Sequence, residues 1–139
     1  MNPQPVGRLI LVLVLALCAL VGGGCVVMND QRALALQAAT ARYESAIRWG
    51  YFETAYGFVD PALRKGKDLP ALYKDLRLTG YEVVQQPMEA DKGKATQIVT
   101  IDYLHEDRQS MMTLTDRQVW QYDKDLKNWW LVSGLPAFK

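Results

Sequence analysis

The residue whose type and position could do chemistry is Asp116, which lies in the alternating segment SMMTLTDRQVWQY. Alternation of polar and apolar residues is typical of a half-buried β-strand. If Asp107 and Arg108 form the preceding turn, this strand pairs with ATQIVTIDYLHE so that Asp116 lies opposite Val99 on the apolar face. Burial there would raise the pKa of the carboxyl group, as a proton-abstracting base requires. There are two alternatives: a bulge turns Asp116 outward, or Arg117 or a helix residue pairs with its carboxylate.

Polar and aromatic side chains accompany Asp116 on this expected inner face. The same pairing places Tyr103 opposite Met112 and Trp120 opposite Ala95. The residues that we expect to line a pocket on this face are Tyr103, Trp120, Gln118, Gln97 and Asp116.

Metal and triad chemistry have little support in the residue types. His105, the single histidine, falls at the rim of the inner face beside a turn, and no matched serine or cysteine nucleophile completes a triad with it. The two cysteines, Cys18 and Cys25, form no metal-ligating cluster with it. We therefore expect no metal and no cofactor.

Trp129 and Trp130 stand apart from the other aromatic residues. Most of the rings are expected to supply the core, as in other small domains, although a group of rings can also line a pocket for an apolar or flat ligand. Adjacent residues of a strand face opposite sides of the sheet, so one of these two tryptophans is expected on the outer face. An outward tryptophan there would mark a protein interface or a membrane-facing patch.

The elements that must position these residues begin with helices. The stretch NDQRALALQAATARYESAIRWG has apolar residues at helical spacing, with Asn29 or Asp30 as the N-terminal cap and Gly50 as the stop. Two shorter helices are expected in YFETAYGFVD and LPALYKDLRL, with Pro61 at a first helical position between them.

From Thr79 onward the period of the sequence changes to two, which predicts four antiparallel strands in a meander. Pro87 in the first of these strands predicts an edge or a bulge, because proline cannot donate to a neighbouring strand. Helices followed by strands predict an α+β fold, with the helices packed against one face of the sheet.

Length and charge limit the function classes. The 139 residues suffice for one domain with one core. Of the 16 Lys and Arg residues only Arg8 precedes position 25, and all 15 Asp and Glu residues follow it, so the part after position 24 is neutral. Nucleic-acid binding needs a basic surplus to neutralise phosphates, so we expect no nucleic-acid partner.

The N-terminal segment has the composition of an export signal. A polar stretch with one arginine, MNPQPVGR, precedes the apolar run LILVLVLALCALV, as in secretory signals. The following GGGC resembles the lipobox of bacterial lipoproteins, in which small residues, here Gly23 and Gly24, precede a cysteine that becomes lipidated. The resemblance implies a thioether-linked diacylglycerol and usually an amine-linked acyl chain on Cys25, and several chains anchor a protein stably. Val26 stands where many inner-membrane lipoproteins have Asp, which favours the outer membrane.

Two alternatives remain for this segment. Residues 9–28 are uncharged, and about 20 such residues span a bilayer as an uncleaved helix, although three consecutive glycines weaken a helix. The other alternative is an ordinary cleaved signal in which Cys25 is incidental. All three interpretations place the folded domain outside the cytoplasm.

Two segments, WGYFETAYGFVDPALR and NWWLVSGLPAF, resemble the NTF2-like superfamily, and the resemblance covers residues 30–138. It implies a sheet that curls around the helices as a cone, with an open end that often holds a pocket. The superfamily contains ketosteroid isomerase, scytalone dehydratase, non-enzymatic scaffolds and small envelope lipoproteins, so the fold alone does not choose a function. Isomerase-type members use an inward acid as a general base, the role that Asp116 would take.

The sequence thus predicts three parts: a signal peptide over residues 1–24, the lipidated cysteine and a short tether over residues 25–29, and an NTF2-like α+β domain over residues 30–139. We expect a non-catalytic binding or docking module in the bacterial cell envelope, facing the periplasm. Its expected partners are the membrane, through Cys25, and a protein partner, a second copy or a small hydrophobic ligand. The alternatives are an isomerase- or hydrolase-type enzyme using Asp116, and a structural subunit with one transmembrane anchor.

Overall fold

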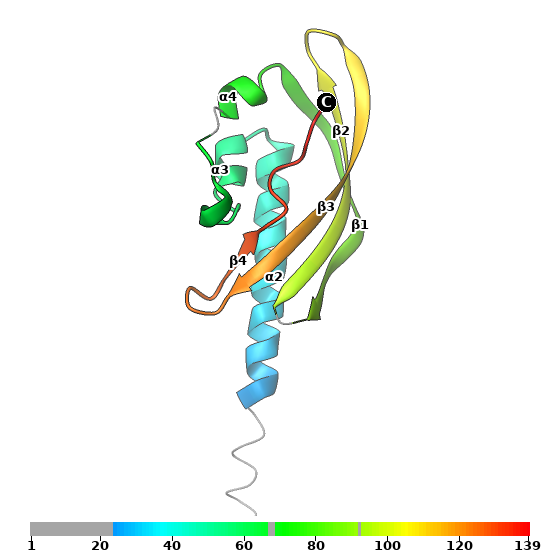
Figure 1. Ribbon diagram of the computed structural model, residues 1–139. Helices are drawn as coiled ribbons and strands as arrows, with labels where there is room; N and C mark the ends of the chain where they lie inside the picture. Colours follow the sequence, from blue (N-terminus) through cyan, green and yellow to red (C-terminus); the bar gives the residue numbers. More distant parts are fainter. Residues whose placement is uncertain (1–23, 67–68, 92) are drawn as a thin grey trace, which may run out of the picture. The chain divides into compact units, whose positions relative to one another are not determined.

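The computed structural model describes residues 24–66, 69–91 and 93–139 (Figure 1). Apart from Gly24, the expected signal peptide lies outside the described residues, and so do the side chains of residues 24–30, Cys25 included. No helix within the described part combines the length and the apolar character needed to cross a bilayer. The chain divides into Met1–Ala33 and Leu34–Lys139, and the fold described below is that of the second unit.

Helix α2 (Gly24–Arg48) begins before Asn29 and Asp30, so neither of these residues starts the helix as expected. Its apolar residues recur at three- and four-residue steps and face the sheet, as the spacing predicts. The buried residues on this face of the helix are Leu36, Ala39, Thr40, Tyr43, Ala46 and Ile47.

Helix α2 ends at Arg48, and Gly50 lies two residues further on as the stop that the sequence predicts. Gly50 has a φ of 71°, in the left-handed region that glycine adopts most easily. The amide of Tyr51 donates to the carbonyl of Ala46 at 2.8 Å, and the amide of Gly50 donates to the carbonyl of Ile47 at 3.0 Å. These two bonds form a Schellman motif, which satisfies carbonyl groups that the helix end would otherwise leave free.

Two short helices follow, α3 (Phe52–Tyr56) and α4 (Leu69–Leu72), with the 3-10 turn η1 (Pro61–Leu63) between them. The Asp60 carboxylate accepts a hydrogen bond from the amide of Ala62 at 2.9 Å and so caps η1, which leaves Pro61 at the first helical position as predicted. Helix α4 is shorter than the sequence predicts, because the end of LPALYKDLRL already belongs to the first strand.

The strands form one antiparallel sheet in the order β1-β2-β3-β4, which is the predicted meander. Their bounds are β1 (Leu76–Asp91), β2 (Lys94–His105), β3 (Ser110–Asp123) and β4 (Asn128–Leu131). Strand β1 begins at Leu76 instead of Thr79 and lies at an edge of the sheet. A register shift between Gln85 and Met88 contains Pro87, so both predicted settings for this proline, an edge and a bulge, are found.

Strands β2 and β3 pair in the predicted alignment without a register shift, for example Val99 with Asp116 and Ala95 with Trp120. The connecting turn is longer than expected, since residues 106–109 lie between the last paired residues. This longer turn is still centred on Asp107 and Arg108, and the alignment is therefore unchanged.

The inner face of the sheet and the helices share one core, so the fold is α+β as predicted. In Figure 1 the long strands bend around α2, while α3 and α4 lie beside it. Side chains of α2 fill the inner face, and the ring of Tyr43 meets the ring of Trp120 edge to face at 5.5 Å. The sheet contributes to this core Ala95, Val99, Ile101, Trp120, Trp129 and Leu131.

Candidate functional site

Asp116 lies on the inner face of β3, where the register predicts it, and its side chain is partly buried. Its Oδ2 atom accepts a hydrogen bond from Nε2 of Gln118 at 3.2 Å. Burial raises the pKa of Asp116, and the hydrogen bond from Gln118 offsets only part of that increase. In the described residues, β3 has no bulge at Asp116 that would turn its side chain outward, and the carboxyl group pairs with Gln118 instead of Arg117.

Two tyrosines that the sequence did not single out complete a polar cluster with Asp116 and Gln118. Tyr81 comes from β1, and its Oη atom accepts a hydrogen bond from Nε2 of Gln118 at 2.9 Å. Tyr43 comes from α2 and is fully buried. Burial is the main reason that the pKa of each phenol lies well above its ordinary value, and the charge of Asp116 raises both further. Both phenols therefore remain protonated at neutral pH.

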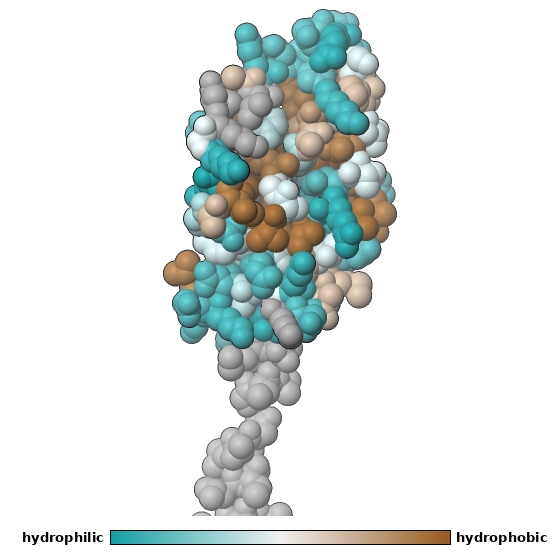
Figure 2. Space-filling view, in the orientation of Figure 1, coloured by the Kyte–Doolittle hydropathy of each residue, from teal (hydrophilic) through white to brown (hydrophobic). Residues whose placement is uncertain are grey.

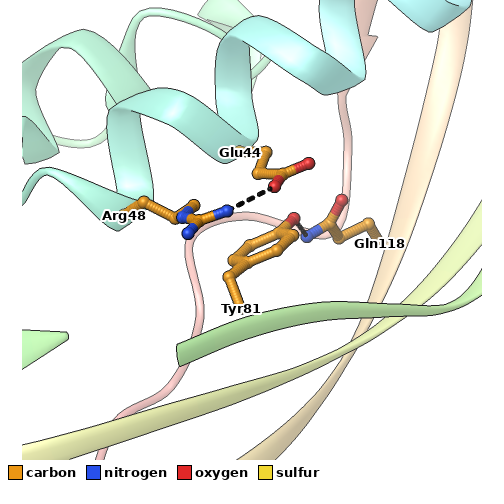
Figure 3. A network of polar contacts seen from close by, with 4 residues as sticks. All are labelled: Glu44, Arg48, Tyr81 and Gln118. Carbon is orange, nitrogen blue, oxygen red and sulfur yellow. Dashed lines mark hydrogen bonds and ion pairs between the residues drawn. The ribbon is translucent and has the colours of Figure 1, made fainter. Parts of the chain in front are cut away.

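Glu44 and Arg48 of α2 lie beside Tyr81 and Gln118 of this cluster (Figure 3). Nη1 of Arg48 contacts Oε1 of Glu44 at 3.3 Å, and the two side chains are 55% and 30% exposed. An ion pair four residues apart on a helix and this exposed contributes only about 0.3–0.5 kcal/mol. Glu44 affects the polar cluster more through its charge, because its carboxylate adds to the rise in the pKa of the Tyr81 phenol that burial causes.

The polar cluster does not line any of the four principal pockets of the described residues. None of these pockets is lined by Asp116 or by the other four residues expected to line one. The physical reason is that side chains of α2 pack directly on the inner face, which leaves Gln118 and Trp120 fully buried. The register brings Gln97, Asp116, Gln118 and Trp120 together, but it does not surround them with an accessible pocket.

Tyr103 and His105 lie near the end of β2 and hold the C-terminal tail, residues 132–139. The main-chain amide of Lys139 donates to Oη of Tyr103 at 3.1 Å, and Nε2 of His105 lies 2.7 Å from the main-chain oxygen of Lys139. The ring of Phe138 meets the Tyr103 ring edge to face at 4.9 Å. These two residues therefore contact the tail and not Asp116.

A pocket lies between the short helices and the tail. It has a volume of about 410 Å³. Figure 2 shows apolar side chains gathered on the face of the domain where the tail runs, with hydrophilic side chains around them. Among the described residues, the lining holds no charged side chain and is formed by Tyr56, Val59, Leu63, Leu69, Tyr73, Val132, Ser133, Gly134, Leu135, Pro136, Ala137 and Phe138.

Aromatic rings form one end of this apolar pocket. The rings of Phe52 and Tyr73 are stacked with centroids 4.3 Å apart. Phe138 meets both edge to face, at 6.3 Å from Phe52 and 5.9 Å from Tyr73. Oη of Tyr56 donates to the carbonyl of Lys65 at 3.0 Å, which orients this ring of the lining. The described lining therefore offers aliphatic and aromatic side chains beside polar groups, and its polar side chains are Tyr56, Tyr73 and Ser133.

The adjacent tryptophans divide between the two faces of β4. Trp129 is 1% exposed and belongs to the core. Trp130 faces the other way, and Cζ of Arg64 lies 5.6 Å from its ring centroid. The same guanidinium donates to the carbonyl of Val59 at 2.8 Å and to that of Gly57 at 2.7 Å. Arg64 thus covers part of the outward ring and ties it to the segment before η1.

The residues of the apolar pocket come from segments far apart in the sequence, which is why no local pattern identified them. In the described part of the chain, no group of three or more His, Cys, Asp and Glu side chains is placed to hold a metal ion. No protein-family model, no curated protein and no solved structure matches the chain. The class of protein is therefore described from the structure alone. It is an α+β domain with a partly buried polar cluster and a separate apolar pocket.

Proposed function

We propose that this protein is a lipoprotein of the bacterial cell envelope whose α+β domain is a non-catalytic binding module for a small, uncharged, apolar ligand. The observation that carries the proposal is the apolar pocket of about 410 Å³, whose described lining residues carry no charged side chain. Ligand pockets of proteins fall in this range of volume and are mostly apolar, with a few polar groups that orient the ligand.

The chemistry of the lining favours a neutral ligand. A charged group that left water for this pocket would meet no opposite charge among the described lining residues, and burial of an unpaired charge is costly. Aromatic rings at one end offer stacking and edge contacts to a flat or acyl group. The hydroxyl of Tyr73 can donate to a carbonyl or hydroxyl of such a ligand, and so can that of Ser133, whose oxygen already accepts from the amide of Val119 at 3.1 Å.

The location is proposed from the N-terminal sequence. The lipobox-like GGGC favours lipidation of Cys25, with the domain in the periplasm and the outer membrane favoured over the inner one. The NTF2-like assignment is also part of the proposal, and the order of helices followed by a bent four-stranded meander supports it. A structural subunit with a single transmembrane anchor is the alternative to this anchoring.

A second candidate function, an isomerase- or hydrolase-type activity, has one specific observation in its favour. Burial raises the pKa of Asp116, and a phenol and an amide lie beside it. The binding module has the stronger support, because the accessible pocket lies elsewhere and is not lined by Asp116.

The test uses protein purified from membranes of its native host and two matched variants, Leu63→Glu and Leu126→Glu. Both leucines are exposed, at 49% and 66%, but only Leu63 lines the apolar pocket. Apolar molecules are extracted from each protein and measured per mole by mass spectrometry, which also reports the mass of the Cys25 peptide. We expect a bound compound in the wild type and in Leu126→Glu, reduced about tenfold in Leu63→Glu, since about 1.4 kcal/mol corresponds to that factor. Equal extracts from both variants would contradict the ligand site, and an unmodified Cys25 in a chain that starts at Met1 would contradict the lipid anchor.

A further inference from the structure

Four polar atoms in the core have no hydrogen-bond partner among the described protein groups: Oη of Tyr43, Oε1 of Gln97, Oε1 of Gln118 and Nε1 of Trp120. Their side chains are fully buried except Gln97, which is 4% exposed. Buried polar groups in proteins nearly always bind to a protein group or an ordered water molecule, because an unpaired one is costly. Four such atoms in one domain therefore indicate a partner that the protein itself does not supply.

The four side chains share one place in the fold. Gln97 and Gln118 are directly paired across β2 and β3 on the inner face, and Trp120 is the next inward residue along β3. Such paired and diagonal side chains lie within reach of one another. Tyr43 approaches from α2, where its ring meets the Trp120 ring at 5.5 Å. Burial raises the pKa of the Tyr43 phenol, and the charge of Asp116, the inward residue before Gln118 on β3, raises it further.

The orientation of the Gln118 amide is set by its neighbours. Nε2 of Gln118 donates one hydrogen bond to Oη of Tyr81 at 2.9 Å and one to Oδ2 of Asp116 at 3.2 Å, and these use both of its hydrogens. A reversed amide would bring Oε1 against the Asp116 carboxylate. The free oxygen is therefore a consequence of the cluster, and it needs a donor from elsewhere.

We propose that these four atoms form a binding site for one buried water molecule that joins α2 to β2 and β3. The indole N–H and the phenol O–H are donors, and the two amide oxygens are acceptors. A water molecule accepts two hydrogen bonds and donates two, so it satisfies all four groups at once. An ammonium ion has no acceptor for the indole and phenol groups. The four side chains are almost completely shielded from solvent, which favours one small molecule over a larger ligand.

The first experiment counts long-lived water molecules in the full-length chain in detergent by magnetic relaxation dispersion of oxygen-17. The variant Gln97→Met removes one acceptor and retains the length of the side chain. We expect the dispersion amplitude of the variant to be lower by one long-lived water than that of the wild type. Ile101→Val is the matched control, because Ile101 is buried on the same face of β2 and carries no polar atom. Its amplitude is expected to equal that of the wild type.

A second measurement uses the wild type alone and decides the question if Gln97→Met does not fold. In NMR spectra the indole N–H of Trp120, assigned with Trp120→Phe, is expected to show a nuclear Overhauser effect from a slowly exchanging water. The indole N–H of Trp49, which is 72% exposed, provides the solvent reference. No such effect at Trp120, or an unchanged dispersion amplitude in folded Gln97→Met, would overturn the proposal.

Discussion

Replacement of Phe138 by alanine is expected to release the C-terminal tail and to remove one wall of the apolar pocket. The Phe138 ring makes edge-to-face contacts with Tyr103 at 4.9 Å, with Tyr73 at 5.9 Å and with Phe52 at 6.3 Å. It therefore joins the end of the tail to β2, to the segment after α4 and to α3 at a single point.

The expected cost follows from these contacts. One aromatic edge contact contributes about 0.5–1.5 kcal/mol beyond area burial. Burial of roughly half of a phenylalanine side chain contributes about 1 kcal/mol. The three contacts share one ring and do not add fully. We therefore expect the free energy of unfolding to fall by about 2–3 kcal/mol in Phe138→Ala.

Urea unfolding of the full-length chain in detergent, followed by circular dichroism, measures this change. Phe138→Leu is the matched control, since it keeps much of the apolar area and loses the ring contacts, and we expect it to lose about 1 kcal/mol. The apolar compound bound to the wild type should be absent from extracts of Phe138→Ala. A loss below about 0.5 kcal/mol with the bound compound retained would refute the role given to Phe138, because surface substitutions fall in that range.

Three further outcomes are expected. Burial raises the pKa of Asp116 above 3.8, so the folded protein holds this proton more tightly than the unfolded chain, and the ionised carboxylate destabilises the fold at neutral pH. Asp116→Asn should therefore be more stable than the wild type at pH 7 in thermal unfolding. The difference in stability should vanish as the pH falls through the raised pKa toward 3.8. A difference that does not depend on pH would contradict a raised pKa of Asp116. Arg64→Lys should cost about 1 kcal/mol and make Trp130 fluorescence easier to quench with acrylamide, since lysine cannot replace the two guanidinium bonds; unchanged quenching would argue against the cover. Gly50→Ala should cost about 1 kcal/mol in urea unfolding, because φ at this position is 71°, while Gly66→Ala, where φ is not in the left-handed region, should be neutral.

The sheet and its register could be read from the sequence because the information is local. Alternation with a period of two assigns each side chain of β2 and β3 to a face, and one burial pattern satisfies both strands at once. The inward position of Asp116 and its partner Val99 follow from this pattern. The observed turn, residues 106–109, has one more residue on each side than the predicted turn, so the alignment of β2 with β3 is the same.

The sequence predicted the first residues of the helices and strands less well than their order. Asn29 and Asp30 are good capping residues, yet α2 begins at Gly24, because a cap is only a local preference that a longer helix can override. Likewise β1 begins at Leu76, three residues before the alternation becomes visible at Thr79, since pairing with β2 continues to its last residue, His105.

What the sequence determined by itself is therefore the α+β class, the order of the strands and the side of the sheet on which Asp116 lies. The tertiary structure alone decided that Tyr43 and Tyr81 join Asp116, that α2 fills the face expected to hold a pocket, and that the accessible pocket forms between the short helices and the tail. The physical reason is distance along the chain, because periodicity describes only neighbours within one helix or strand. Residues such as Leu63 and Phe138 come to line one pocket only when separate elements pack together.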